Sequence, residues 1–242
     1  MRSRLIGVFV AIAACVGGVH AAGVPGQGTW ETTLQARDLN HDGVTDAFYD
    51  TVLDVTWLRD ANVKGPMDWV TANGWANNLI VSGFGGWRLP TMIDTGAPGC
   101  DWSYAGGTDC GANVQTKNGA VVYSEMAYLF YDTLGNKAYC PPGEPSCAGG
   151  PQLGWGLTNS GDFQNLEPFY YWTDLDYAPA PGNPWFFRTS DGIQGNDAGN
   201  SEMYALAVHP GDVAAVPEPQ TYALMLADLG AMLTVARRRR SN

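Results

Sequence analysis

The chain has 242 residues, of which roughly 195 lie between two terminal segments with the composition of targeting signals, enough for one folded domain with a core. Its 31 Gly, 15 Pro and 9 Trp residues are typical of a loop-rich protein with large aromatic anchors and argue against long helices. With residues 1–22 and 221–242 set aside, seven basic and 23 acidic residues give the body a net charge of −16, which argues against nucleic acid and anionic lipid as partners and leaves cations and neutral glycans compatible.

The N-terminus has the three parts of a secretory signal peptide. Arg2 and Arg4 precede the apolar run 5–19, and small residues follow, so we expect a signal peptide over residues 1–22, cleaved after Ala21 or Ala22. A buried helix would need a polar stripe that this run lacks. One alternative is a lipobox at residues 12–15, in which Cys15 would be lipidated and retained, although the apolar run continues past it.

An acidic loop follows at residues 38–46. Its oxygen-bearing side chains stand at positions 1, 3, 5 and 9 of a calcium-loop spacing, with Gly43 at the sharp turn; they are Asp38, Asn40, Asp42 and Asp46. Position 12 is Tyr49 instead of a bidentate carboxylate, so we expect at most a low-affinity calcium site and no EF-hand. The alternative is a polar hairpin turn that joins strands at residues 32–37 and 48–55.

A strand and a helix are predicted next. Residues 49–58 are rich in Val, Thr and aromatic residues, which predicts one strand. Gly65 and Pro66 then indicate a helix start with Pro66 at the first position, and the helix should run to about Leu79. Trp69 falls on its apolar face, so we interpret it as a core anchor and not as a ligand site.

Four cysteines remain once the signal is removed, and an even number in an exported chain favours disulfides. We expect Cys100 to pair with Cys110 and Cys140 with Cys147, because each pair closes a short loop, although sequence alone allows three connectivities. Zinc is the alternative, but the spacings contain no C-x-x-C, and only His41 and His209 remain in the mature chain.

A second helix is predicted from Ser124, its N-cap, through Glu125 in the first turn to Leu134 before Gly135. Residues 170–208 contain aromatic strand-like runs separated by Gly, Asn, Asp and Pro loops. The predicted fold class is therefore α+β, with two helices, antiparallel strands and many loops.

The middle of the chain resembles a known family. Thr56-Trp57-Leu58, a Trp-bearing helix, Gly86-Trp87-Arg88-Leu89-Pro90, Tyr171-Trp172-Thr173 and a closing Ala205-Leu206-Ala207-Val208 look like the Lcl C-terminal domain-like family over residues 57–213. The resemblance implies a single domain similar to C-type-lectin-like and formylglycine-generating-enzyme folds, preceded by an N-terminal strand region at residues 23–56. It further implies an envelope protein whose ligand, where one is suspected, is a glycan.

Within the Gly86–Pro90 motif we expect Trp87 and Leu89 to lie in the core. Arg88 should pair with a local carboxylate or with carbonyl groups and not bind a ligand. The chain departs from the family at its closing strand, where Val208-His209-Pro210 stands in place of a basic or aromatic ending.

The C-terminus carries a short motif, an apolar stretch at residues 221–236 and a basic cluster; the motif and cluster residues are Pro217, Glu218, Pro219, Arg237, Arg238, Arg239 and Arg240. A near-spanning helix with a basic end halts in a membrane with that end in the cytoplasm. The order closely resembles the PEP-CTERM sorting signal (residues 214–242), which implies transient anchoring in the inner membrane by a transmembrane helix and processing by an exosortase. Asp228 departs from the pattern, because a carboxylate there costs about 2.5–3.5 kcal/mol on insertion.

We do not expect an enzyme, since the chain has no Gly-x-Ser-x-Gly elbow, no phosphate loop and no His with a spaced His or Glu partner. A glycan site needs an exposed aromatic face and several polar side chains, and residues 172–200 offer both. Trp172 should face the core, so Trp185 is the predicted stacking residue. Its predicted polar neighbours are Asp174, Asp176, Asp191, Asn196, Asp197 and Asn200.

The sequence is compatible with two functions. One is an exported, non-enzymatic protein of the envelope or extracellular matrix that associates with glycan or exopolysaccharide through a lectin-like domain. The other is a secreted structural protein, stabilised by disulfides and by calcium, that binds no sugar. Signal peptidase and an exosortase are the expected processing partners. Apart from the calcium considered for the acidic loop, no cofactor is predicted.

We predict that the mature protein lacks residues 221–242, because the terminal motif, apolar stretch and arginine cluster form a removable sorting signal. Intact-mass measurement of protein isolated from the native envelope checks this. A mature species that retains Arg237 to Arg240 would contradict the prediction.

Overall fold

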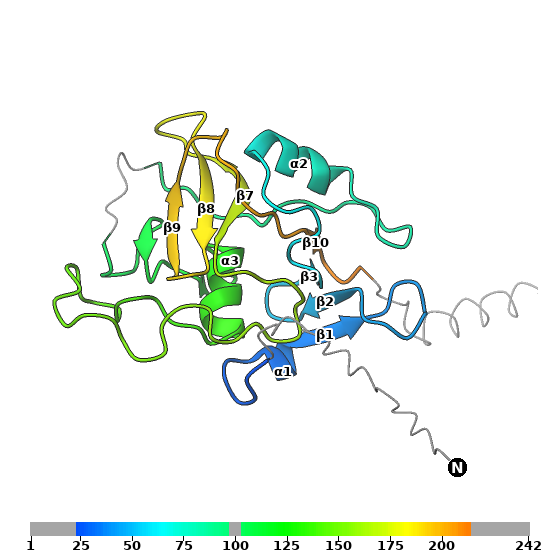
Figure 1. Ribbon diagram of the computed structural model, residues 1–242, viewed down its shortest axis with the longest axis horizontal. Coiled ribbons are helices and arrows are strands. Elements are labelled where there is room, and N and C mark those ends of the chain that lie inside the picture. The colour runs from blue at the N-terminus through cyan, green and yellow to red at the C-terminus, as the bar shows by residue number, and fades with distance from the viewer. Residues whose placement is uncertain (1–22, 97–102, 214–242) are drawn as a thin grey trace, which may run out of the picture.

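Short antiparallel strands joined by long loops make up most of the structure, a computed structural model that describes residues 23–96 and 103–213 (Figure 1). The predictions for the signal peptide and Cys15, for Cys100 as the partner of Cys110, and for the sorting segment at 214–242 lie outside these residues. The described part is an α+β domain with mostly antiparallel sheets and few helices, as the sequence predicts.

The first sheet has the strand order β1-β2-β3-β10. Its strands are β1 (Leu34–Arg37), β2 (Ala47–Asp50), β3 (Val55–Leu58) and β10 (Val208–Pro210), and all neighbours are antiparallel. Residues 38–46 connect β1 and β2, which confirms the predicted hairpin across the acidic loop. The expected domain boundary at residue 56 falls inside β3, so residues 23–56 share this sheet with the rest of the chain.

The prediction of one strand over residues 49–58 is wrong, because a turn at residues 51–54 divides it into β2 and β3. The buried Asp50 carboxylate accepts hydrogen bonds from the amides of Val52 (2.9 Å) and Leu53 (3.1 Å). Asp54 completes the turn with a positive φ of 54°. An aspartate that satisfies nearby backbone amides in this way favours a turn over a continuous strand.

The second sheet has the order β4-β9-β8-β7 and confirms the strands expected in the last third of the chain. Its members are β4 (Gly111–Ala112), β7 (Tyr170–Asp176), β8 (Pro184–Arg188) and β9 (Ile193–Asn196). The first four residues of β8 are all buried, since β8 is an interior strand that is covered on both faces. A separate small ribbon pairs β5 (Lys117–Asn118) with β6 (Val121–Val122).

Residues 203–210 connect the two sheets. Backbone bridges join Met203 to Met67 and Tyr204 to Tyr171, and Val208 bridges to Arg88 before β10 pairs with β3. The main core lies around this connection and includes Trp57, Trp87 and Leu206. Trp87 and Leu89 expose 1% and 0% of their surface, which confirms the prediction that they lie in the core.

Three α-helices accompany the sheets among the residues that the structure describes: α1 (Trp30–Thr33), α2 (Trp69–Asn77) and α3 (Glu125–Tyr128). The predicted start of α2 is wrong: Asp68 is the N-cap and accepts from the Thr71 amide at 2.7 Å, so the helix begins three residues after Pro66. Trp69 is half-buried and packs on the second core cluster, as a core anchor should.

The N-cap of the predicted second helix is confirmed, but the helix is α-helical only in its first turn and π-helical after it. The Ser124 hydroxyl accepts a hydrogen bond from the Ala127 amide, and Glu125 lies in the first turn. After α3 the chain continues as the π-helical turn η1 (Leu129–Thr133) and ends before Gly135, which has a φ of 65°.

A disulfide joins Cys140 to Cys147, with 5.6 Å between their Cα atoms, and confirms one of the two predicted pairs. It closes the loop at residues 141–146. Cys110 is buried in the cluster that contains Met92, Tyr177 and Trp185.

The predicted pairing of Arg88 with a carboxylate is confirmed, although the partner comes from α3. Its guanidinium donates to both oxygens of Glu125 at 2.7 Å, and Glu125 Oε2 also accepts from the Thr91 amide at 2.8 Å. The Glu125 side chain is only 6% exposed and that of Arg88 is 25% exposed. This bidentate pair therefore fixes the Gly86–Pro90 motif to the start of α3.

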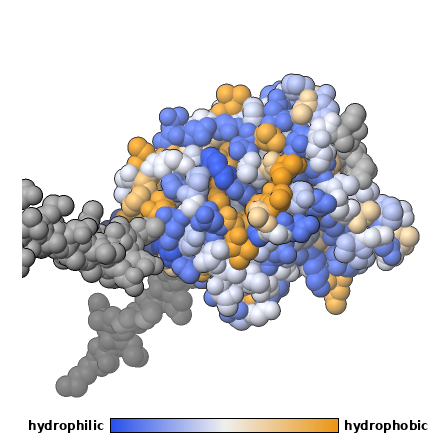
Figure 2. All heavy atoms as spheres, turned by 180° about the vertical axis from the view of Figure 1, so that it is seen from behind, coloured by the Kyte–Doolittle hydropathy of each residue, from blue (hydrophilic) through white to orange (hydrophobic). Residues whose placement is uncertain are grey.

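The surface mixes polar and apolar residues. In Figure 2, apolar residues are interspersed among hydrophilic ones on the face seen from behind. Within residues 23–96 and 103–213, no helix combines the length and the apolar composition that crossing a bilayer requires.

We predict that Glu125→Gln lowers the free energy of unfolding by about 2–4 kcal/mol, because a largely buried guanidinium would lose its charged partner. Urea unfolding at neutral pH measures the change. Glu202→Gln, which neutralises an exposed carboxylate, is the control and should stay within about 0.5 kcal/mol of the parent. Equal stability of the two variants would contradict a structural role for the pair.

Candidate ligand-binding site

The prediction that Trp185 presents an exposed stacking face is wrong. Trp185 exposes only 1% of its surface, its Nε1 donates to Asp94 Oδ2 at 3.0 Å, and its ring packs edge-on against Tyr177. The physical reason is the position of β8 inside its sheet, which buries both alternating sets of side chains. Trp172 is also buried, as predicted.

The polar residues predicted around Trp185 mostly stabilise their own loops. Asp176 accepts from the Gly182 amide, Asp191 forms an ion pair with Arg188, and Asp197 accepts from the Ala198 amide. Burial raises the pKa of Asp174, which is half-buried beside the Arg88–Glu125 pair. Asn196 is half-buried, and Asn200 is exposed. These side chains therefore have no exposed Trp185 ring to surround.

The acidic loop satisfies its own backbone. Asp38 accepts from the amides of Asp42 and Gly43, Asp42 accepts from Val44, and Asp46 accepts from Leu39. The Gly43 amide is the main cause of a lowered pKa at Asp38. In the part of the chain that the structure describes, no three His, Cys, Asp or Glu residues form a group suited to a metal ion. Calcium binding by Asp38, Asn40, Asp42 and Asp46 stays a prediction.

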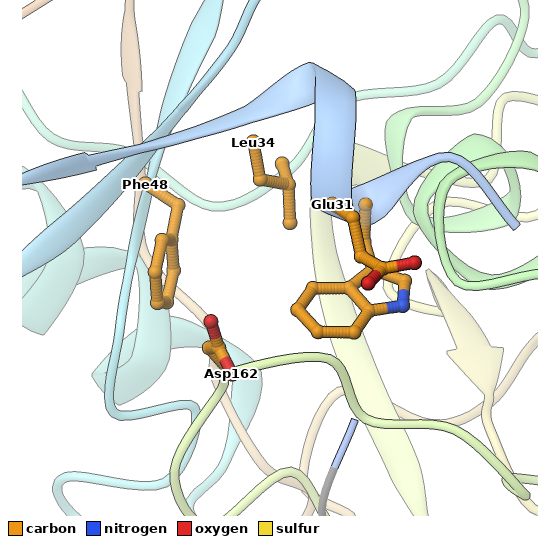
Figure 3. Close-up of a pocket in the computed structure, with 5 residues that line it drawn as sticks. Glu31, Leu34, Phe48 and Asp162 are labelled. Atoms are coloured by element: carbon orange, nitrogen blue, oxygen red, sulfur yellow. The ribbon is translucent and has the colours of Figure 1, made fainter. Parts of the chain in front are cut away.

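A pocket of about 200 Å³ lies where the N-terminal segment meets the first sheet, at a place that the sequence did not single out (Figure 3). It is lined by Trp30, Glu31, Leu34, Phe48 and Asp162. Figure 3 shows Glu31 and Asp162 with their carboxylates near the open space, and Leu34 and Phe48 beside them. The pocket thus combines two aromatic rings and an aliphatic side chain with two acids.

The residues of the pocket come from three distant segments. Trp30 and Glu31 open α1, Leu34 begins β1, and Phe48 is in β2, whereas Asp162 belongs to the loop before Phe163. The rings of Phe48 and Phe163 meet edge-on at 5.2 Å, which anchors the base of the pocket in the main core.

The buried Asn159 side chain holds two of these segments together. Its Oδ1 accepts from the amides of Val24 (2.8 Å) and Gly161 (3.0 Å). Its Nδ2 donates to the carbonyls of Gln27 (3.0 Å) and Leu134 (2.8 Å). All four hydrogen-bonding positions of the amide are therefore used, and they fix the chain just before Trp30 against the chain just before Asp162.

Asn136 extends this amide network. Its Oδ1 accepts from the amides of Thr158 and Asn159, both at 2.9 Å, and its Nδ2 donates to the Asn159 carbonyl at 2.8 Å. Asn136 and Asn159 expose 3% and 0% of their surface, so water does not compete for these bonds.

Glycines shape the wall around the Trp30 ring. A Cβ at Gly23 would lie 2.6 Å from the ring, and a Cβ at Gly161 would lie 3.5 Å from it. The indole Nε1 points to the Val24 carbonyl at 3.4 Å. The half-buried ring is thus held by backbone that passes close to it, and this leaves it little freedom to reorient.

The two carboxylates of the pocket differ in their partners. Glu31 Oε2 accepts from the Gly26 amide at 2.8 Å. The exposed Asp162 carboxylate forms no hydrogen bond or ion pair with the residues that the structure describes. The lining contains no basic side chain, so the potential at the pocket is negative.

Among the residues that the structure describes, Trp155 is exposed on the surface away from the pocket. Trp155 is 41% exposed and meets Tyr139 edge-on at 4.7 Å, next to Leu153, which is 95% exposed. The contacts that the structure gives for Trp155 include no acidic side chain comparable to Asp162. This surface is therefore a weaker candidate for a ligand-binding site than the Trp30 pocket.

Comparison with family models, with curated proteins and with solved structures gave no match for this chain.

We predict that Asn159→Ala lowers the free energy of unfolding by about 3 kcal/mol, because it removes four hydrogen bonds at once, of which those with the Gly161 amide and the Leu134 carbonyl are buried. Thermal unfolding followed by circular dichroism measures the loss. Asn73→Ala, at a half-buried position on α2 with a single long side-chain hydrogen bond (3.3 Å), is the control and should cost far less. Similar losses in the two variants would contradict the special role of the amide network.

Proposed function

We propose that this chain is an exported, non-enzymatic protein of the cell envelope or extracellular matrix that associates with glycan or exopolysaccharide. The Trp30 pocket is the observation that carries the proposal, because it places an aromatic ring and free carboxylate oxygen at one accessible depression. Saccharides are recognised by this combination, in which apolar faces of the sugar stack on rings and hydroxyls donate to carboxylates.

The proposed architecture is a C-type-lectin-like domain, similar to the Lcl C-terminal domain-like family. Its support is the position of the Gly86–Pro90 motif, whose Trp87 and Leu89 are core residues and whose Arg88 bridges to the closing strand region at Val208. A loop-rich α+β domain with two antiparallel sheets is compatible with this assignment.

The proposed location follows from the two ends of the chain. Signal peptidase would remove residues 1–22, and an exosortase would process the segment around Pro217, Glu218 and Pro219 at the inner membrane. The Cys140–Cys147 disulfide agrees with an oxidising compartment.

The alternative is a secreted structural protein that binds no sugar. The observation that favours it is that the carboxylates of the acidic loop and of residues 174–197 form hydrogen bonds and ion pairs mainly within their own loops. Binding experiments separate the two functions.

We predict that the full chain is retained on exopolysaccharide from its own envelope and that Trp30→Ala weakens retention about tenfold, the equivalent of about 1.4 kcal/mol. Trp155→Ala, which removes the exposed tryptophan outside the pocket, is the matched control and should keep most of the binding. Quantitative pull-down with both variants, at a temperature at which circular dichroism shows each of them folded, measures the retention. Absence of any retention of the parent chain would favour the structural alternative.

A further inference from the structure

We infer that the Trp30 pocket binds a positively charged amino group, so that the preferred glycan is one built from amino sugars with free amines. This inference rests on the proposed glycan association and specifies its chemistry. It is carried by the charge, the ring and the size of the pocket.

Charge is the first argument. Asp162 is exposed and has no cation as a partner among residues 23–96 and 103–213, and Glu31 keeps Oε1 available while Oε2 accepts from Gly26. Both acids therefore offer carboxylate oxygens to a cationic ligand at the pocket. An ammonium group fits this place, with three N–H donors for carboxylate oxygens.

The aromatic ring supplies the second argument. Trp30 is held by Gly23, Gly161 and the Val24 carbonyl, so its orientation is set before a ligand arrives. Indole is the side chain with the strongest attraction for a cation over its face. A neutral acetamido sugar could stack on the ring but would leave the carboxylates without a charged partner.

Size and the surrounding field give the third argument. The pocket volume of about 200 Å³ is far above the roughly 10–15 Å³ that one water needs on the same measure, so the pocket has room for a group much larger than a water. The body carries a net charge of −16, so a polyanionic glycan is repelled and a cationic one is attracted over longer distances.

The experiment compares three immobilised probes with the full chain: β-1,4-linked glucosamine oligomers, the same oligomers fully N-acetylated, and polylysine. We expect binding to the free-amine oligomers at least about tenfold tighter than to the acetylated ones, and weaker binding as salt is raised. Asp162→Asn should lose about tenfold in affinity for the free-amine oligomers, whereas Glu202→Gln, the same charge change outside the pocket, should lose less than twofold.

Each other outcome counts against the inference in a distinct way. Equal binding of free and acetylated oligomers, or an equal loss in the two charge variants, overturns the amine specificity while the proposed glycan association survives. Binding to polylysine without binding to either sugar indicates a basic protein as partner and overturns the amino-sugar inference, whereas retention on the native exopolysaccharide decides the proposed glycan association separately. The melting temperature of Asp162→Asn is a control: a value equal to that of the parent shows that a loss of affinity concerns the ligand and not the fold.

Discussion

The hydrogen bonds of one buried amide, Asn159, are the constraint on which the candidate site depends. A loop-rich chain has many backbone groups that no helix or strand satisfies, and each buried one needs a partner. Asn159 provides for four of them at once and joins the N-terminal segment to the loop at residues 158–162 and to the end of η1. Trp30 and Asp162 follow directly in these two segments, so the pocket inherits its geometry from the network.

In the rest of the domain, too, polar side chains form hydrogen bonds with backbone groups that no strand or helix satisfies. Short strands provide few ladder hydrogen bonds, and side chains complete the remainder: Asp50 and Asp68 bind turn and helix amides, and Glu125 binds Arg88 and the Thr91 amide. Aromatic residues from strands of both sheets, such as Trp57, Tyr171 and Phe187, belong to the same core, and the Cys140–Cys147 disulfide closes a loop outside the strands. A stable platform of this kind can carry a small rigid site at its edge.

The sequence was sufficient where local patterns decide the structure. Aromatic runs predicted β7 and β8, the Ser124 N-cap predicted the start of α3, and the Gly86–Pro90 motif predicted the burial of Trp87. The sequence pattern does not determine the order of strands in a sheet. For that reason the sequence predicts Trp185 at the surface, although β8 is an interior strand.

The pocket could not be predicted because its parts are far apart in the chain. Trp30 and Asp162 are brought together by hydrogen bonds between residues such as Val24 and Asn159, and no periodicity records such contacts. The four-residue helix α1 is also too short to leave a periodic pattern. The adjacent Trp30 and Glu31, an aromatic and an acidic residue outside any strand pattern, could have indicated a binding site. They form a pocket only together with Asp162, whose proximity the sequence does not show.

The most direct test of the account is amide hydrogen exchange of the full chain with and without the bound glycan. We expect protection on binding to concentrate in residues 26–34 and 158–163, because these segments form the pocket and share the amide network. Protection confined to residues 150–156, around Trp155, or to residues 174–200 would place the ligand elsewhere and contradict the assignment of the Trp30 pocket.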